Sequence, residues 1–127
     1  MFSHITVGSN DIARSRRFYD AVFGAIGGAP AVENDRGQLV YMNRGGLLIV
    51  TQPIDGNAAT FANGGTIGFT IDSPEQADAW HAAGVAAGGK AIEDPPGVRE
   101  MGGRRMYLAY LRDPDGNKLC AVHWMAS

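Results

Sequence analysis

Long apolar runs, pairs of cysteines and clusters of basic residues are all missing from this chain of 127 residues. No apolar segment approaches the roughly 20 residues that a membrane-spanning helix needs, so we expect no membrane partner. The single cysteine, Cys120, cannot form a disulfide within the chain, which is typical of proteins from a reducing compartment. The first residues also lack a signal-type segment, and together these absences predict a cytoplasmic location.

The charge balance excludes another class of partner. The chain has 11 Lys and Arg residues against 13 Asp and Glu residues, a formal net charge of −2, and its arginines are scattered among acidic residues. Nucleic-acid-binding domains instead concentrate basic residues on one face. We therefore expect no nucleic-acid partner. The remaining composition, 45% apolar and 19% charged, is that of one ordinary globular domain.

What the chain does contain is an internal repeat. The segment 4–8, HITVG, is echoed 62 residues later by the segment 66–70, TIGFT, and each leads into a helix-like stretch. Each half then continues through glycine-marked turns to a last apolar strand. The repeat predicts two βαβββ modules in a single domain spanning 1–127: module one at about 1–53, a polar linker at about 54–64, and module two at about 65–127.

Local signals place the elements of each module. Capping oxygens at 9–11 predict a helix that runs to about Phe23, and the capping box Ser73-Pro74-Glu75-Gln76 predicts the start of the second helix. Alternating apolar residues and turn residues predict the strands. These strands are expected at 2–8, 29–33, 38–43, 46–52, 66–71, 90–93, 106–112 and 117–124, with a long loop at about 94–105. The fold class is therefore α+β.

Strand alternation sorts the side chains onto two faces, because successive residues point to opposite sides of a sheet. If Ile5 and its apolar neighbours lie under the first helix, His4 and Thr6 face the other way, and so does Thr66 in module two. The turns at 44–45 and 115–116 align the two last strands. Four equivalent positions are then expected to converge on one concave face: His4, Ile49, Thr66 and Cys120.

These features resemble the vicinal oxygen chelate superfamily, the group of glyoxalases, bleomycin resistance proteins and extradiol dioxygenases. The resemblance rests on the duplicated unit, on His4 with Arg17-Phe18-Tyr19 in the following helix, and on the segment 112–118, RDPDGNK. The segment 95–99, PPGVR, is similar to a branch of small bacterial members. The resemblance covers nearly the whole chain. It implies an open, incomplete eight-stranded barrel with helices on its outer face, and a homodimer.

The resemblance also implies a divalent metal, held by one residue from the first and last strands of each module. This sequence departs from that pattern at three positions: Thr66 replaces a histidine, and Ile49 and Cys120 replace carboxylates. A catalytic zinc normally has three protein ligands, and hard metals prefer oxygen ligands. We expect the metal site to be degraded, with His4 and Cys120 as weak metal candidates. No cofactor is certain; zinc, nickel or manganese would be expected only in an enzyme.

Further candidate ligand-binding residues lie in the second half of the chain. Arginine suits bidentate recognition of a carboxylate or phosphate, and the loop at 95–105 carries several arginines, although a solvated hairpin explains them equally well. Tyr107 is a candidate aromatic wall, as are Tyr41 and Tyr110, although edge-strand packing would also account for them. Cys120 has the alternative role of a small buried apolar residue. The full predicted ligand-binding set is His4, Thr6, Thr66, Cys120, Arg99, Arg104, Arg105 and Tyr107.

Two classes of function follow. The first is a protein similar to glyoxalases and bleomycin resistance proteins that binds a small anionic or oxygen-rich molecule in the barrel cavity. The alternative is a metal-dependent lyase or isomerase of the glyoxalase type, or a related transferase or dioxygenase, in which a carboxylate moves a proton beside the metal. The lack of a carboxylate at Ile49 or Cys120 favours the first class. Whether the protein is an enzyme stays open, and no catalytic residue is assigned.

Overall fold

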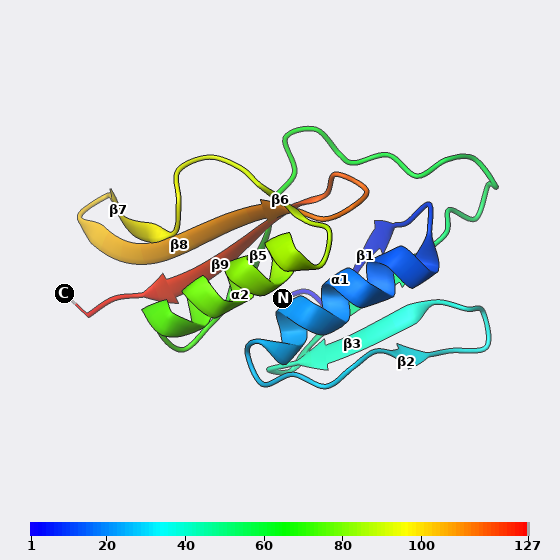
Figure 1. Cartoon of the computed structure of the whole chain (residues 1–127), viewed down its shortest axis with the longest axis horizontal. Coiled ribbons are helices and arrows are strands. Elements are labelled where there is room, and N and C mark those ends of the chain that lie inside the picture. The colour runs from blue at the N-terminus through cyan, green and yellow to red at the C-terminus, as the bar shows by residue number, and fades with distance from the viewer. Residues whose placement is uncertain (127) are drawn as a thin grey trace.

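The computed structural model describes residues 1–126 and consists of two mixed sheets, each with a helix on one face (Figure 1). Module one contains one helix and a four-stranded sheet in the order β1-β4-β3-β2, in which β1 runs parallel to β4. Its elements are β1 (Ile5–Gly8), α1 (Ile12–Gly24), β2 (Val32–Glu33), β3 (Leu39–Asn43) and β4 (Gly46–Thr51).

Module two repeats this plan with a five-stranded sheet in the order β5-β9-β8-β6, in which β7 also pairs with β8. Its elements are β5 (Ile67–Thr70), α2 (Pro74–Ala86), β6 (Lys90–Ala91), β7 (Gly97–Met101), β8 (Arg104–Arg112) and β9 (Lys118–Trp124). Again the first strand runs parallel to the last, β5 beside β9. The predicted α+β class and the two βαβββ-like modules are confirmed.

The structure differs from the sequence-based prediction in the segment expected to be a loop. Residues 97–101 form β7, which pairs antiparallel with β8 from Met101↔Arg104 to Gly97↔Leu108. The chain reverses at Gly102 and Gly103, both at positive φ, where glycine is the favoured residue. The strand was missed because charged residues interrupt its apolar alternation.

The register of the two sheets follows the internal repeat. Thr6 of β1 lies opposite Ile49 of β4, and Gly68 of β5 lies opposite Cys120 of β9. Ile49 and Cys120 therefore occupy equivalent positions in the two modules, as the turn alignment predicts. Both residues lie on the sheet faces that the helices leave uncovered, because each alternates with residues packed beneath a helix.

Each helix begins where its capping residues predict. The Asp11 side chain accepts a hydrogen bond from the Arg14 backbone N–H at the start of α1, and Ser73 does the same for Gln76 at the start of α2. Four large residues of α1 and two residues of α2 enter a core that both modules share. These residues are Phe18, Tyr19, Val22, Phe23, Ala77 and Trp80.

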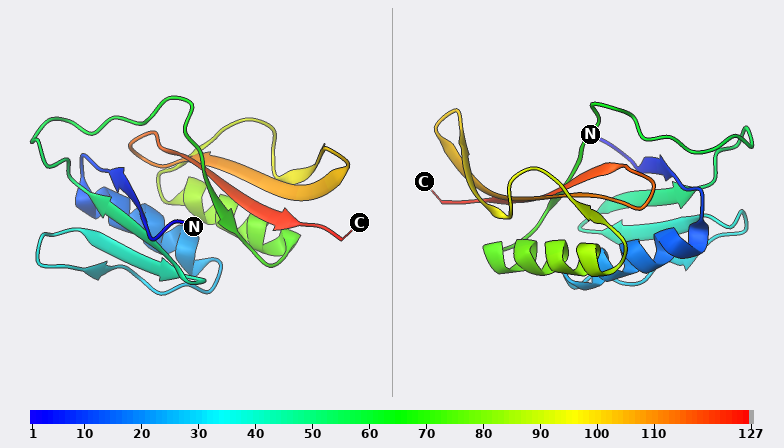
Figure 2. Two further views of the ribbon diagram at one scale, coloured as in Figure 1. Left: turned by 180° about the vertical axis from the view of Figure 1, so that it is seen from behind. Right: turned by 45° about the horizontal axis from the view of Figure 1, so that its top comes forward.

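Both helices lie on the same side of the molecule, as Figure 2 shows. Their packing joins the modules, with Gly84 of α2 close enough to α1 that an added Cβ would lie 3.0 Å from a Val22 methyl carbon. The opposite faces of both sheets remain without a covering helix. Among residues 1–126, neither helix has the length and apolar character needed to cross a membrane.

A buried polar network joins the modules just beyond the end of β1. The Asp115 side chain, 1% exposed, accepts hydrogen bonds from the Asn10 backbone N–H and from the Arg14 guanidinium, each at 2.9 Å. Beside it, the fully buried Tyr19 donates its hydroxyl hydrogen to Asp113 at 2.5 Å. These five residues lie at one end of the boundary between the modules, which we call the closed end.

The internal repeat places a second, weaker link at the other end of this boundary. Arg44 stands in the β3–β4 turn, at the position equivalent to Asp115, and forms an ion pair with Asp72, at the position equivalent to Asn10. Both side chains are well exposed, 47% for Arg44 and 63% for Asp72. We call the Arg44–Asp72 pair and its surroundings the open end. Equivalent positions therefore link the two modules at both ends of the boundary, through a buried network at the closed end and an exposed ion pair at the open end.

Candidate functional site

A cavity of about 420 Å³ lies at the open end. Its lining includes Ile5 of β1 and Ile67 of β5. In the described part of the chain, β1 and β5 each pair with another strand on one side only, so each brings a free strand edge to the boundary. The volume falls within the range of small-molecule binding sites, roughly 300–1,000 Å³.

Aromatic rings form one wall of the cavity. Phe23, from the end of α1, stacks on Tyr41 of β3 with ring centroids 4.9 Å apart, and meets Phe69 of β5 edge to face at 5.5 Å. The Tyr41 hydroxyl donates a hydrogen bond to Asp20, and burial raises the pKa of Tyr41 well above its ordinary value. Tyr41 is therefore neutral, with its hydroxyl engaged by the protein.

The polar part of the lining is basic and neutral. It includes Arg44, Asn43, Thr70 and the exposed His4, whose Nδ1 lies 2.8 Å from the Ser3 hydroxyl oxygen. None of the described residues that line the cavity is acidic. Arg44 could hold an anion here in competition with Asp72, the carboxylate that already pairs with it.

The structure places the predicted residues of the first strands on different surfaces. His4 lines the cavity. Thr6, in β1, is exposed beside Ile49 on the uncovered face of the module-one sheet. Thr66 is exposed directly before β5. Neither threonine lines the cavity.

Cys120 lies on the uncovered face of the module-two sheet. It is 4% exposed and packs with Met106 and Leu108 in a small apolar cluster. Burial raises the pKa of its thiol, so the sulfur stays protonated near neutral pH. A protonated thiol is a poor metal ligand, since metals bind the thiolate.

The residues at the metal positions implied by the resemblance do not fit a metal centre. Within residues 1–126, no three His, Cys, Asp or Glu side chains lie close enough together to hold a metal ion. The four positions offer one imidazole, one hydroxyl, one buried thiol and an isoleucine. Neither a three-ligand catalytic zinc nor an oxygen-liganded hard metal is matched by this set of donors.

The predicted residues of the β7–β8 hairpin are occupied by contacts within module two. Arg99 donates to the backbone carbonyls of Asp94 and Pro95, at 3.2 and 2.9 Å, and so holds the loop before β7. The Arg104 guanidinium lies over the Trp124 ring, 4.5 Å from its centroid. Neither arginine lines the cavity.

The other two predicted residues of this hairpin belong to the helix-facing side of the sheet. The Tyr107 hydroxyl donates to Asp78 of α2 at 2.8 Å, and this bond, more than burial, raises the pKa of Tyr107. Arg105 shares that side by strand alternation. As a ligand-binding set, the residues of this hairpin remain a prediction.

Sequence reasoning named Tyr41 as a candidate aromatic wall, but it missed Phe23, Phe69 and Arg44. Strand alternation predicts Phe69 beneath the second helix, and the turn residues predict Arg44 only in a turn. Neither pattern reveals that the two modules leave a gap between them. One signal was present: the repeat makes Arg44 equivalent to Asp115, a residue of the motif that supports the resemblance. A polar residue at that turn in both halves indicates a contact with the other module.

Comparison with known proteins decides the family. A family model described as the Glyoxalase/Bleomycin resistance protein/Dioxygenase superfamily matches residues 1–121. The chain belongs to this superfamily. The resemblance drawn from the repeat and the RDPDGNK segment is thereby confirmed. No curated protein matches the chain.

Two solved structures resemble the chain, one at high and one at low sequence identity. A glyoxalase/bleomycin resistance protein from Albidiferax ferrireducens T118 is 52% identical, with a TM-score of 0.93, and the match covers 97% of this chain and 98% of that one. A glyoxalase/bleomycin resistance protein/dioxygenase family enzyme from Burkholderia phytofirmans PsJN is 19% identical, with a TM-score of 0.72, covering 97% and 98%. The second match shows the fold alone.

Proposed function

We propose that this member of the glyoxalase/bleomycin resistance protein/dioxygenase superfamily binds a small anionic or oxygen-rich molecule, and that the metal site implied by the resemblance is degraded. The ligand sits in the cavity at the open end of the module boundary, beside His4. The observation that carries the proposal is the cavity itself: about 420 Å³, with an aromatic wall, a basic residue and no acidic residue among its described lining.

The ligand part of the proposal is tested by NMR on labelled protein with a library of small carboxylic acids, phosphates and sugars. At least one compound is expected to shift the resonances of cavity residues, with Ile5, Ile67 and Phe69 as reporters. Leu108, which is buried in the separate cluster with Met106 and Cys120 and does not line the cavity, serves as the internal control. A library that leaves the cavity resonances unmoved would contradict the proposal.

The metal part is tested on the same protein, purified without chelators, by elemental analysis. We expect far less than one equivalent of zinc, nickel or manganese, because one imidazole and one protonated thiol are too few donors. One equivalent of tightly held metal would contradict this expectation and favour the metal-dependent lyase or isomerase alternative.

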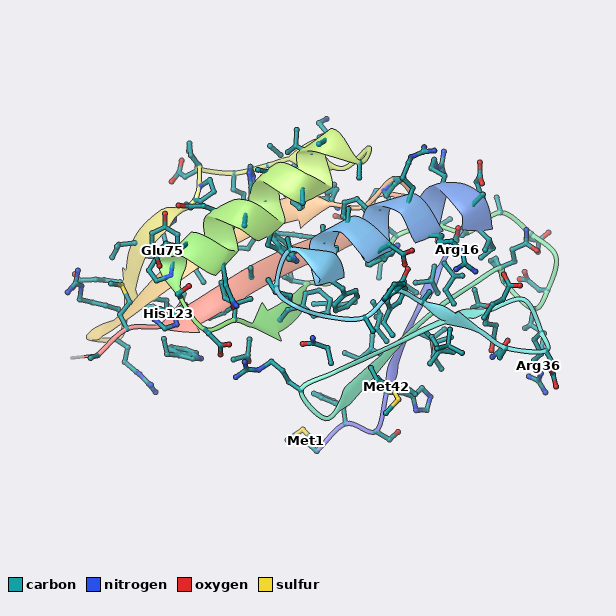
Figure 3. The ribbon with its side chains drawn as sticks, turned by 60° about the horizontal axis from the view of Figure 1, so that its bottom comes forward. Met1, Arg16, Arg36, Met42, Glu75 and His123 are labelled. Atoms are coloured by element: carbon teal, nitrogen blue, oxygen red, sulfur yellow. The ribbon has the colours of Figure 1, made fainter. Side chains whose placement is uncertain are left out.

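We also propose that two copies of the chain associate through the uncovered sheet faces. Large apolar side chains remain exposed there, Met42 at 75% and Met101 at 70%. Figure 3 shows Met42 on the side of the molecule away from the helices. Exposed apolar area of this kind is common at protein–protein interfaces. A homodimer is the assembly that the family resemblance implies, and a second copy would cover these side chains.

Sedimentation velocity tests this association. We expect a species of about twice 13.4 kDa, and Met42→Glu is expected to shift it toward the monomer by placing a charge in the apolar face. Ala79→Glu, at an exposed position of α2, is the matched control and should leave the dimer intact. A wild-type protein that sediments only as a monomer at high concentration would refute the assembly.

A further inference from the structure

We propose that the ligand of the cavity is a planar aromatic carboxylate, whose ring lies against Phe69 in the aromatic wall that Phe23 and Tyr41 support from behind, and whose carboxylate pairs with Arg44 in place of Asp72. This inference rests on the proposed function, because it names the chemical class of the molecule that the cavity binds. It depends on three observations: the aromatic wall, the charge at the rim, and the conformation of Arg44.

The aromatic wall favours a flat ring. Phe23 and Tyr41 are nearly parallel, with 22° between their ring planes, whereas Phe69 stands almost perpendicular to Phe23 at 84°. An aromatic ligand can continue this arrangement by stacking or by an edge-to-face contact, both of which are favourable geometries. The other apolar lining residues are Met1, Phe2, Ile5, Leu47, Leu48 and Ile67. Phe23 and Tyr41 are only 3% and 2% exposed and support the wall from behind, so the half-buried Phe69 is the ring that a ligand can contact most directly. A sugar or a short aliphatic acid would form no ring–ring contact with Phe69.

The rim favours a carboxylate. Arg44 lines the cavity, and its guanidinium can form two parallel hydrogen bonds with a planar anion. Its present partner, Asp72, is itself a carboxylate, so the ligand would replace one carboxylate by another of the same geometry. Both side chains of the pair are well exposed, and exposed ion pairs contribute little to stability. The exchange therefore costs the fold little.

Arg44 occupies a backbone position that does not suit arginine. It has φ 52° and precedes Gly45 with φ 81° in the two-residue turn between Asn43 and Gly46. Such turns strongly prefer asparagine or glycine at the first position. The turn itself requires the left-handed conformation at this position, and arginine adopts that conformation less readily than asparagine or glycine. An arginine side chain is therefore present at the cavity rim at some cost to the turn.

The closed end supports the same conclusion. There the equivalent turn residue, Asp115, is buried and bonded to Asn10 and Arg14, and that link already holds the modules together. The Arg44–Asp72 pair is exposed and makes one such contact. Its position at a cavity, together with its weak structural role, is consistent with a group that releases its partner when a ligand enters.

The test uses 2-naphthoate as the probe and 2-naphthamide, of the same shape but uncharged, as its comparison, with titration calorimetry for affinity and NMR for position. We expect 2-naphthoate to bind at the cavity more tightly than 2-naphthamide. Arg44→Asn should weaken 2-naphthoate about tenfold and leave 2-naphthamide unchanged, because only the charge-assisted bonds are lost. Asparagine suits this turn, so the variant is expected to fold.

Two further variants complete the design. Asp72→Asn is expected to tighten 2-naphthoate several-fold, because the competing carboxylate is gone. Arg36→Asn is the matched control and should change nothing: Arg36 is exposed in the turn before β3, at the opposite end of the module-one sheet from Met1 (Figure 3).

The outcomes separate this inference from the proposed function. If 2-naphthamide binds the cavity as tightly as 2-naphthoate, or if Arg44→Asn weakens neither, the carboxylate assignment is wrong although the cavity still binds small molecules. If 2-naphthoate fails to bind while other acids or sugars of the library shift Ile5 and Phe69, the aromatic class is wrong and the proposed function stands. If no compound at all reaches the cavity, both are refuted.

Discussion

Replacing Asp113 by alanine is expected to lower the free energy of unfolding by about 4 kcal/mol, because the change leaves several buried donors without an acceptor. The Asp113 carboxylate accepts from the Tyr19 hydroxyl and from the backbone N–H groups of Asp115 and Asn117. The Asn117 side chain donates to it as well. Urea unfolding followed by circular dichroism measures the loss.

Tyr19→Phe is the control that separates this network from general packing. It removes a single hydroxyl from a fully buried ring, and we expect a loss of only about 1 kcal/mol. The double variant should lose less than the sum of the two single changes, since the orphaned hydroxyl is then absent. Strict additivity would show that the hydrogen bond between Tyr19 and Asp113 does not couple the two modules.

The protonation of Tyr19 adds a check on the same network. Burial, and then the neighbouring Asp113, raise the pKa of Tyr19 well above its ordinary value. A group whose pKa is raised on folding stabilises the native state fully below its unfolded pKa and loses that contribution as the pH rises above it. The wild-type protein should therefore lose stability above about pH 10, and Tyr19→Phe should lose less over the same range.

Gly89→Ala is expected to cost about 3 kcal/mol, the second large effect, because the space for a side chain is filled largely by rigid backbone. An added Cβ would lie 2.8 Å from the Gly84 carbonyl oxygen, 3.1 Å from the Arg112 carbonyl oxygen, and 2.4 Å from a ring carbon of Phe18. The Gly89 backbone N–H also donates to Gly84 at 2.8 Å at the end of α2. Thermal unfolding provides the measurement.

The same substitution at Gly24 is the matched control with the opposite sign. Gly24 is the last residue of α1, and nothing lies within 4 Å of an added Cβ there. Alanine should raise the free energy of unfolding by about 0.5–1 kcal/mol, through its higher helix propensity. If both alanine variants were equally stable, the close approach at Gly89 would not be the cause of the predicted loss.

Structural features that depend on short stretches of sequence could be predicted. The capping residues Asp11 and Ser73 mark the beginnings of both helices because a side-chain oxygen next to an unpaired backbone N–H is a local requirement. The internal repeat predicts two similar modules, and it also predicts that Ile49 and Cys120 are equivalent. Each of these features depends on residues that are neighbours in sequence or on a comparison of one half with the other.

Features that depend on how the modules pack were not predictable in this way. The cavity exists because β1 and β5 do not pair with one another, and no residue of either strand encodes that gap. Of the predicted ligand-binding set, His4 alone lines the cavity, and of the three candidate aromatic walls Tyr41 alone does. Arg99 and Tyr107 were proposed from their chemistry, but their nearest partners come from the preceding loop and from α2. Their polar groups are therefore already bonded within module two.

The unequal strength of the two links between the modules has a consequence for how such a molecule can change over time. A chain built by duplicating one unit has two equivalent contacts between its modules. One strong contact is enough to hold the modules together. Positions around Arg44 and Asp72 can then be substituted without separating the two modules, whereas positions around Asp115 cannot. New small-molecule preferences can therefore arise on one side without the protein coming apart.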